Sequence, residues 1–323
     1  MTSYLLRLLC LCLASFFLVH LAFGLLVRLV ATSVRRAALR MEARTAANLL
    51  FALRSLPAAT AFVVVTCLCA PSYLWLEPAA SDEEVGLGCL LAAVLGLAVL
   101  GEAVVRGYRA YRRSRRQIDR WERNGYPAER PATRTPVWLV NEDSALVALT
   151  GILRPRVLVS EPVIAALSTE QLDAVLQHEE AHRASGDNLK RLLMAAAPAT
   201  LPLVGGFETL ERAWASATEW AADDRVAQRS RRRALALASA LVQVARLNSA
   251  AAPPLIASLF ADGAELSARI ERLLHPPLRV ARAPQSPILK AAASVTLVAA
   301  MAGVMLQPAM FHSVHELLEN LIR

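Results

Sequence analysis

The sequence predicts a mostly α-helical integral membrane protein, with about four transmembrane helices and an α+β domain inserted between the third and the fourth. Of the 323 residues, 55% are hydrophobic, and they occur in long blocks separated by charged segments. This organisation is typical of membrane proteins rather than of soluble enzymes. Between residues 136 and 275 the apolar residues are instead spaced as in short strands and amphipathic helices, which indicates a folded domain.

Four apolar stretches are long enough to cross a bilayer core: about residues 8–27, 55–76, 85–105 and 291–311. The first could also be a cleaved signal peptide ending at Ala22-Phe23-Gly24. We favour a permanent anchor, because the apolar run is long for a signal peptide and continues to Val27.

The charges of the loops predict the orientation of these spans. The loop between the second and third spans contains Glu77, Asp82, Glu83 and Glu84 but no Lys or Arg. Arginines cluster between the first two spans and directly after the third: Arg28, Arg35, Arg36, Arg40, Arg44 and Arg54, then Arg106, Arg109, Arg112, Arg113, Arg115, Arg116, Arg120 and Arg123. By the positive-inside rule, the N-terminus lies outside and the domain lies in the cytoplasm, at the cell membrane.

Residues 106–135 are expected to be a basic juxtamembrane segment and a linker. The arginines could contact nucleic acid, but beside a span they are better explained by anionic lipid headgroups, so we expect no direct nucleic-acid partner. Three short apolar runs follow at residues 136–140, 145–149 and 156–160 and predict a small sheet. The last strand, with Arg156, Val157, Leu158 and Val159, is either an edge that binds an extended peptide substrate or part of a purely structural hairpin.

The motif H-E-x-x-H occurs once, in Gln177-His178-Glu179-Glu180-Ala181-His182. Ser168 and Gln171 predict a capping box that starts the helix, and an apolar stripe runs into the motif. On a helix, His178 and His182 lie one above the other and can hold one Zn2+ ion, with Glu179 beside it. The alternative is two surface histidines on an amphipathic helix.

A catalytic zinc site usually has a third protein ligand. The carboxylates on the helix predicted near residues 209–229 are candidates: Glu208, Glu211, Glu219, Asp223 and Asp224. Glu219 and Asp223 form the best pair, because their i, i+4 spacing places both on one face among alanines. We expect Glu219 to be the third ligand and Asp223 to orient a ligand histidine. A solvated acidic face is the alternative.

The remaining segments are less informative. Residues 192–207 are apolar but interrupted by prolines and glycines, which favours a re-entrant or interfacial segment. Residues 276–290 are expected to be a linker and a possible site of autocleavage. Residues 312–323 are expected to form a short amphipathic tail lying on the membrane outside the cell.

Together, the run Gly151-Ile152-Leu153-Arg154-Pro155-Arg156-Val157-Leu158-Val159-Ser160, the H-E-x-x-H motif, Asp187 and the E-x-x-x-D pattern at Glu219 and Asp223 resemble the BlaR/MecR-type membrane metallopeptidases. The more distant HtpX and CAAX-protease family shares the last two patterns. The resemblance implies a gluzincin-like protease domain in which His178, His182 and Glu219 bind one zinc ion, Glu179 is the catalytic base, and Asp223 and Asp187 support them. Only residues 312–323 follow the last predicted span in this sequence, so we expect a short form without the large extracellular sensor of the antibiotic-sensing members.

These observations predict a zinc metalloendopeptidase that cleaves a cytoplasmic or membrane-proximal protein. The resemblance implies a transcriptional repressor as substrate, together with cleavage of the protease itself. Two alternatives stay open: a quality-control protease that degrades many misfolded membrane proteins, and a non-catalytic membrane scaffold with a residual zinc site. The intact base Glu179 argues against the scaffold.

Overall fold

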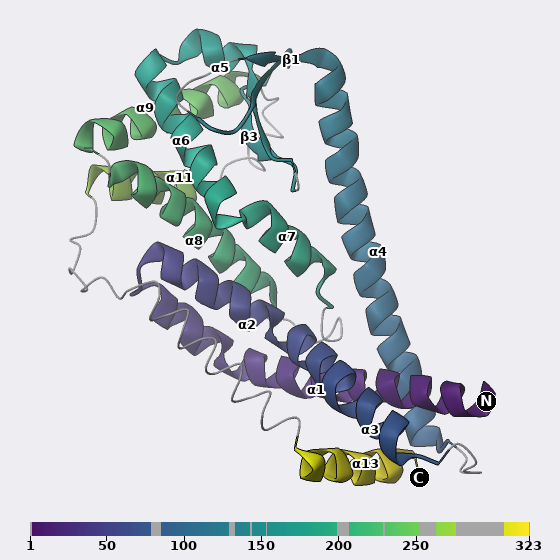
Figure 1. Cartoon of the computed structure of the whole chain (residues 1–323). Coiled ribbons are helices and arrows are strands. Elements are labelled where there is room, and N and C mark those ends of the chain that lie inside the picture. Colours follow the sequence, from purple (N-terminus) through teal and green to yellow (C-terminus); the bar gives the residue numbers. More distant parts are fainter. Residues whose placement is uncertain are drawn as a thin grey trace.

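The computed structural model describes residues 2–78, 85–128, 133–142, 144–152, 154–198, 207–228, 230–251, 263–275 and 307–322. Figure 1 shows a bundle of long helices at one end of the molecule and a small sheet surrounded by shorter helices at the other, with α4 running between the two. Most of the described residues are helical.

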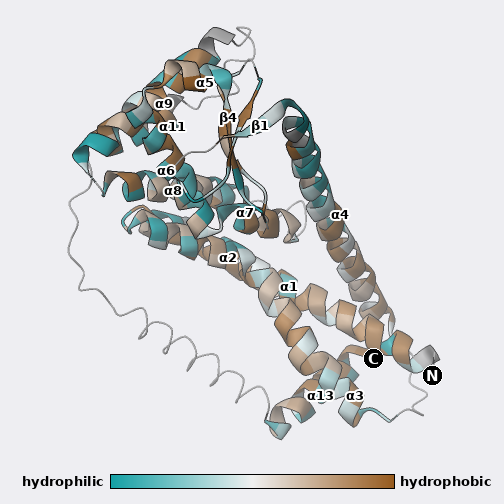
Figure 2. Ribbon diagram, turned by 45° about the horizontal axis from the view of Figure 1, so that its top comes forward, coloured by the Kyte–Doolittle hydropathy of each residue, from teal (hydrophilic) through white to brown (hydrophobic). Residues whose placement is uncertain are grey.

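Three helices are long and apolar enough to cross a membrane: α1 (Thr2–Ala38), the continuous rod formed by α2 (Ala43–Val64), η1 (Val65–Cys69) and α3 (Ala70–Leu76), and α4 (Leu87–Asn124). They correspond to the first three predicted spans. The π turn η1 ends two residues before Pro71, which has no N–H to donate and whose ring would clash with the carbonyl of Cys67 in a regular helix. Figure 2 shows the apolar residues concentrated where these helices meet.

The structure differs from the expected linker at its beginning, where the chain forms a strand. Helix α4 continues through the arginine-rich segment to Asn124, and Gly125–Ala128 form strand β1. Arginine is a good helix former, and i, i+4 pairs such as Arg115 with Asp119 (3.7 Å) support the extension. Trp121 anchors the end of α4 against the sheet by packing on Val140 and Leu158.

The sheet has four strands, β1, β2 (Val137–Val140), β3 (Val147–Thr150) and β4 (Arg156–Ser160), in the order β1-β2-β4-β3. Strands β2 and β4 are parallel, and the other two pairs are antiparallel. The expectation that Arg156, Val157, Leu158 and Val159 form an edge is therefore wrong, because β4 lies in the interior and the edges are β1 and β3. Residues 157–160 are all buried, as is typical of an interior strand.

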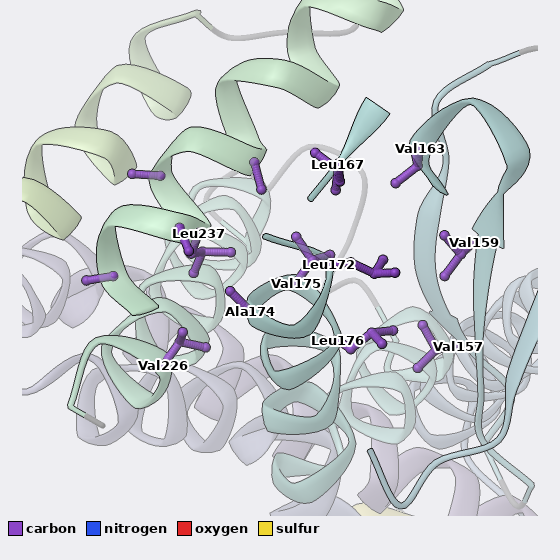
Figure 3. Close-up of a cluster of buried hydrophobic side chains, with 14 of the residues drawn as sticks. Val157, Val159, Val163, Leu167, Leu172, Ala174, Val175, Leu176, Val226 and Leu237 are labelled. Carbon is purple, nitrogen blue, oxygen red and sulfur yellow. The ribbon is translucent and has the colours of Figure 1, made fainter. Parts of the chain in front are cut away.

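The other helices at this end are α5 (Glu161–Ala166), α6 (Thr169–Ser185), α7 (Asp187–Ala196), α8 (Phe207–Ala227), α9 (Arg231–Ala251) and α11 (Gly263–Leu274). Helix α6 packs on β3 and α5 on β4, whereas α7, α8 and α9 pack on α6, and α11 packs on α8 and α9. Figure 3 shows Leu172, Val175 and Leu176 of α6 between strand β4 and helix α9. The apolar stripe predicted from the sequence is thus the core that holds α6 in place. Of the segment 192–207, residues 199–206 lie outside the described residues; residues 192–196 complete α7.

Most of the fourth predicted span, residues 291–306, lies outside the described residues, as does the whole linker 276–290. Residues 308–311, placed in that span, instead begin helix α13 (Pro308–Ile322). This helix packs on α3: Ser72 Oγ donates to the carbonyl of Phe311 (2.7 Å). Because its apolar residues Leu318 and Ile322 are buried against other helices, the tail is part of the helical bundle rather than free on a membrane surface.

Candidate metal centre

Helix α6 presents the H-E-x-x-H motif at its C-terminal half. Ser168 and Gln171 make the predicted capping box, and Gly186 ends the helix with a left-handed backbone (φ 67°). Glycine adopts this conformation without the steric cost of a side chain. The turn redirects the chain into α7, so that Asp187 at the start of α7 returns to the motif.

The two histidines face each other across one turn of α6. His178 Nε2 and His182 Nε2 are 3.1 Å apart, and both side chains are buried. Two imidazole nitrogens at this distance cannot both be occupied by protons without repulsion, whereas a metal ion bound by both is favourable. The surface-histidine alternative does not fit this burial.

Glu219 on α8 completes the cluster. Its Oε2 lies 3.4 Å from His178 Nε2 and its Oε1 lies 3.5 Å from His182 Nε2. The candidate ligand atoms of His178, His182 and Glu219 all lie within 4.8 Å of one another. Two of the other candidates are used elsewhere, since Glu211 pairs with Arg54 and Asp224 pairs with Arg272.

A carboxylate lies next to the second nitrogen of each histidine. Asp223 Oδ1 is 3.0 Å from His178 Nδ1, and Asp187 Oδ2 is 2.8 Å from His182 Nδ1. A carboxylate at Nδ1 keeps a proton there and leaves Nε2 free as a ligand, which is the usual arrangement around metal-binding histidines. Both expected supporting residues therefore lie where that role requires.

These charges shift the proton affinities of the site in the absence of a metal. Burial opposes ionisation of His182, but its contacts with Asp187 and Glu219 outweigh burial and raise its pKa to about 10. Burial likewise opposes charge on Glu219, but His178 and His182 outweigh it, so the pKa of Glu219 is lowered. Glu219 therefore stays ionised, and a metal cation would bind to the site in place of protons.

Glu179 and its neighbour Glu180 have different surroundings. Glu179 Oε2 accepts a hydrogen bond from Leu149 N–H of β3 (2.8 Å), which holds this carboxylate beside the two histidines. Glu180 points away: its carboxylate accepts from Thr133 and Thr135 and pairs with Arg183.

Arg269 of α11 is a site residue that the sequence analysis missed. Its guanidinium donates to both oxygens of Asp223 (2.8 Å each) and lies 3.0 Å from Glu219 Oε2. Nothing in the local sequence predicts this contact, because Arg269 is separated from Asp223 by 46 residues.

The site opens into a cavity of about 390 Å³ between β3, α6 and α9. One end holds the polar residues His178, Glu179, His182, Glu219 and Arg269. The other end is apolar. It is lined by side chains of β3, α6 and α9, including Val147, Val175, Leu237, Leu241 and Val244. This volume is typical of a ligand pocket.

Comparison with known protein families gives one match. The family model described as peptidase family M48 matches residues 113–277, which include every residue of the metal centre. The match identifies this family and not the BlaR/MecR-type subgroup. No curated protein and no solved structure matches the chain.

Proposed function

Because the chain belongs to peptidase family M48, we propose that it is a membrane-anchored, zinc-dependent endopeptidase. One observation carries this proposal: His178 and His182 of α6 and Glu219 of α8 place two imidazoles and a carboxylate within 4.8 Å of one another, with Glu179 beside them. Two histidines and a glutamate are the ligands of a common class of catalytic zinc site.

The donor set fits Zn2+ by its chemistry. Both Nε2 atoms point toward Glu219 while Asp223 and Asp187 occupy the Nδ1 sides. Three protein ligands leave one position for water, and bound zinc supplies a Lewis acid and lowers the pKa of that water. We propose one Zn2+ ion per chain.

In the proposed reaction, Glu179 is the general base. Its carboxylate takes a proton from the attacking water and then donates that proton to the nitrogen of the leaving amine. The Leu149 N–H bond fixes the carboxylate on the side of β3, where an extended substrate would lie. The base and the substrate-binding strand are thus held by the same hydrogen bond.

Strand β3, rather than β4, is the edge that a substrate would use. Its outer side faces the cavity, and an extended peptide can add to such an edge by main-chain hydrogen bonds. The metal-site helices also contact the apolar bundle, since α2 packs along α8 and Arg54 of α2 bonds to Glu211. We therefore propose a membrane-proximal protein substrate and, from the arginine distribution, a cytoplasmic site.

Regulated cleavage of a transcriptional repressor, accompanied by self-cleavage, is the biological role that we propose for this site. The alternative role is general degradation of misfolded membrane proteins. A Glu179→Gln variant that traps substrates separates the two, because the first role predicts one captured regulator and the second predicts many membrane proteins.

The proposal is tested by measuring zinc content and cleavage of β-casein and of the protein itself, in detergent-purified wild type, Glu179→Gln and Glu180→Gln. We expect about one zinc per chain in all three and cleavage by wild type and Glu180→Gln only. Glu180 is the matched control, because it is the adjacent glutamate and points away from the site. Loss of zinc from wild type, or equal cleavage by Glu179→Gln, would refute the assignment.

A further inference from the structure

The main-chain groups on the outer side of β3 can be identified from the pairing of the strand with β4. Ser160 N–H donates to the carbonyl of Leu146, and the register pairs Ala148 with Leu158. Alternate residues of an antiparallel strand direct their N–H and C=O groups to opposite sides. Ala145, Val147 and Leu149 therefore present their main-chain groups to the open edge.

Both ends of this edge are already occupied by side chains. At the metal end, Leu149 N–H donates to Glu179, and Asn188 Nδ2 donates to the carbonyl of Leu149 (3.1 Å). At the other end, Ala145 N–H donates to Asn248 Oδ1 (3.0 Å) and Asn248 Nδ2 donates to the carbonyl of Ala145 (3.0 Å). The Asn248 amide thus pairs with Ala145 as a residue of a neighbouring strand would.

Val147 lies between these two occupied residues. No side chain or main chain of the described residues forms a hydrogen bond to its outward N–H or C=O. The open part of the edge is therefore one residue long. A peptide at this edge can form two main-chain hydrogen bonds with Val147. Pairing beyond Val147 is blocked by Asn248.

The side chain of the peptide residue opposite Val147 has a defined direction. Directly paired residues in a sheet point to the same face. Val147 and Leu149 pack on the core between the sheet, α6 and α9. The paired substrate residue would therefore point into the apolar end of the cavity, toward Val175, Leu241 and Val244.

We propose that Asn248 is a specificity-determining residue that closes the substrate-binding edge at Ala145, so that a substrate pairs with Val147 alone and places an apolar side chain against α9. This inference rests on the proposed peptidase function. It defines the substrate class as an extended segment with one apolar residue a short distance from the cleaved bond.

The test uses Asn248→Ala, which frees the main chain of Ala145 without touching the metal centre. The matched control is Gln243→Ala on the same helix, where the amide donates to the carbonyl of Ala166, away from the cavity. Cleavage sites in β-casein are mapped by mass spectrometry. Blocked alanine-based peptides with a single leucine, lengthened two residues at a time, give the dependence of kcat/KM on length.

We expect wild type and Gln243→Ala to require an apolar residue at one position of the peptide. Peptide residues added beyond that position should raise kcat/KM only a little. Asn248→Ala should gain about tenfold in kcat/KM from two further residues, the contribution expected from two additional main-chain hydrogen bonds. Identical length dependence in all three proteins, with cleavage present, would overturn the role of Asn248.

A binding measurement keeps this inference separate from the proposed function. The same peptides, labelled with fluorescein, are titrated into the three zinc-free proteins and followed by fluorescence anisotropy. If none of the proteins cleaves, the proposed function fails, while a gain in affinity with length in Asn248→Ala alone still supports the closed edge. If affinity is independent of length in every protein, the closed edge is refuted.

Discussion

Arg269 of α11 and Asp223 of α8 face each other through two hydrogen bonds of 2.8 Å, and Asp223 also lies 3.0 Å from His178 Nδ1. A second pair lies one residue further along α8 and three residues further along α11: Arg272 donates to both oxygens of Asp224, at 2.8 and 2.7 Å. Two arginine–aspartate ion pairs therefore connect α8 and α11. Only the first of the two pairs touches the metal centre.

This repetition gives a matched pair of substitutions. We expect Arg269→Gln to lower kcat/KM for casein by about tenfold to hundredfold, because fully buried Asp223 and the proposed ligand Glu219 lose their common partner. Arg272→Gln should change kcat/KM for casein by less than about threefold, since the ion pair of Arg272 is more exposed and lies outside the site. Equal losses in the two variants would show that both arginines only fasten α11 to α8.

Asp187 is expected to contribute to metal affinity through His182. Asp187→Ala removes the acceptor 2.8 Å from His182 Nδ1, so the ring can rotate or change tautomer. The affinity for Zn2+, measured by competition with a chelator, should fall by about tenfold to hundredfold. Asp187→Asn keeps an acceptor oxygen and should lose less. An unchanged affinity in Asp187→Ala would mean that packing alone orients the ring.

The parts of this site that could be predicted from the sequence are local. The i, i+4 spacing of His178 with His182, and of Glu219 with Asp223, fixes a common helix face wherever the helix lies. The capping residues Ser168 and Gly186 bound α6 for equally local reasons. The first three apolar spans were also predictable, because bilayer thickness sets their length.

The missed features depend on contacts between distant segments. Strand β4 pairs with β2 on one side and β3 on the other, and periodicity alone does not distinguish an interior strand from a short buried edge. Arg269 reaches the site from a separate helix, so no spacing rule connects it with Glu219. The continuation of α4 into the sheet depends on the packing of Trp121, which becomes visible only when the sheet is formed.

The metal-free protein should lose stability as the pH rises. The pKa of His182 is raised from 6.5 to about 10 on folding. Its contribution to the free energy of unfolding is therefore complete below about pH 6.5 and disappears as the pH approaches 10. The pKa of Glu219 is lowered from 4.5, so its contribution is present above pH 4.5 and is lost only on acidification. Thermal unfolding of EDTA-treated protein from pH 6 to 10 should show a falling Tm. His182→Gln should weaken the fall of Tm with pH. If Tm falls as steeply in that variant as in wild type, His182 is not the cause.

The last prediction concerns Arg54, which ties the apolar bundle to the metal-site helices. Its side chain is only 3% exposed. Its guanidinium donates to Glu211 of α8 (2.7 Å) and to the carbonyls of Met194 (3.3 Å) and Ala197 (3.2 Å) at the C-terminal end of α7. Because α7 follows the motif helix and α8 carries Glu219, one buried side chain of α2 contacts both helices that flank the site.

Arg54→Leu should therefore destabilise the protein by about 1–2 kcal/mol, because the carbonyls of Met194 and Ala197 each lose one buried donor. Each keeps a second donor, since Ala197 N–H bonds to Met194 and Arg106 bonds to Ala197. Glu211 is 41% exposed and can be rehydrated, so its loss of a partner adds little. The control is Glu208→Gln, an exposed glutamate in the first turn of α8, which should change stability by less than about 0.5 kcal/mol. Thermal unfolding in detergent measures both. A Tm of Arg54→Leu equal to that of the control would mean that the apolar contacts between α2 and α8 alone join the bundle to the metal centre.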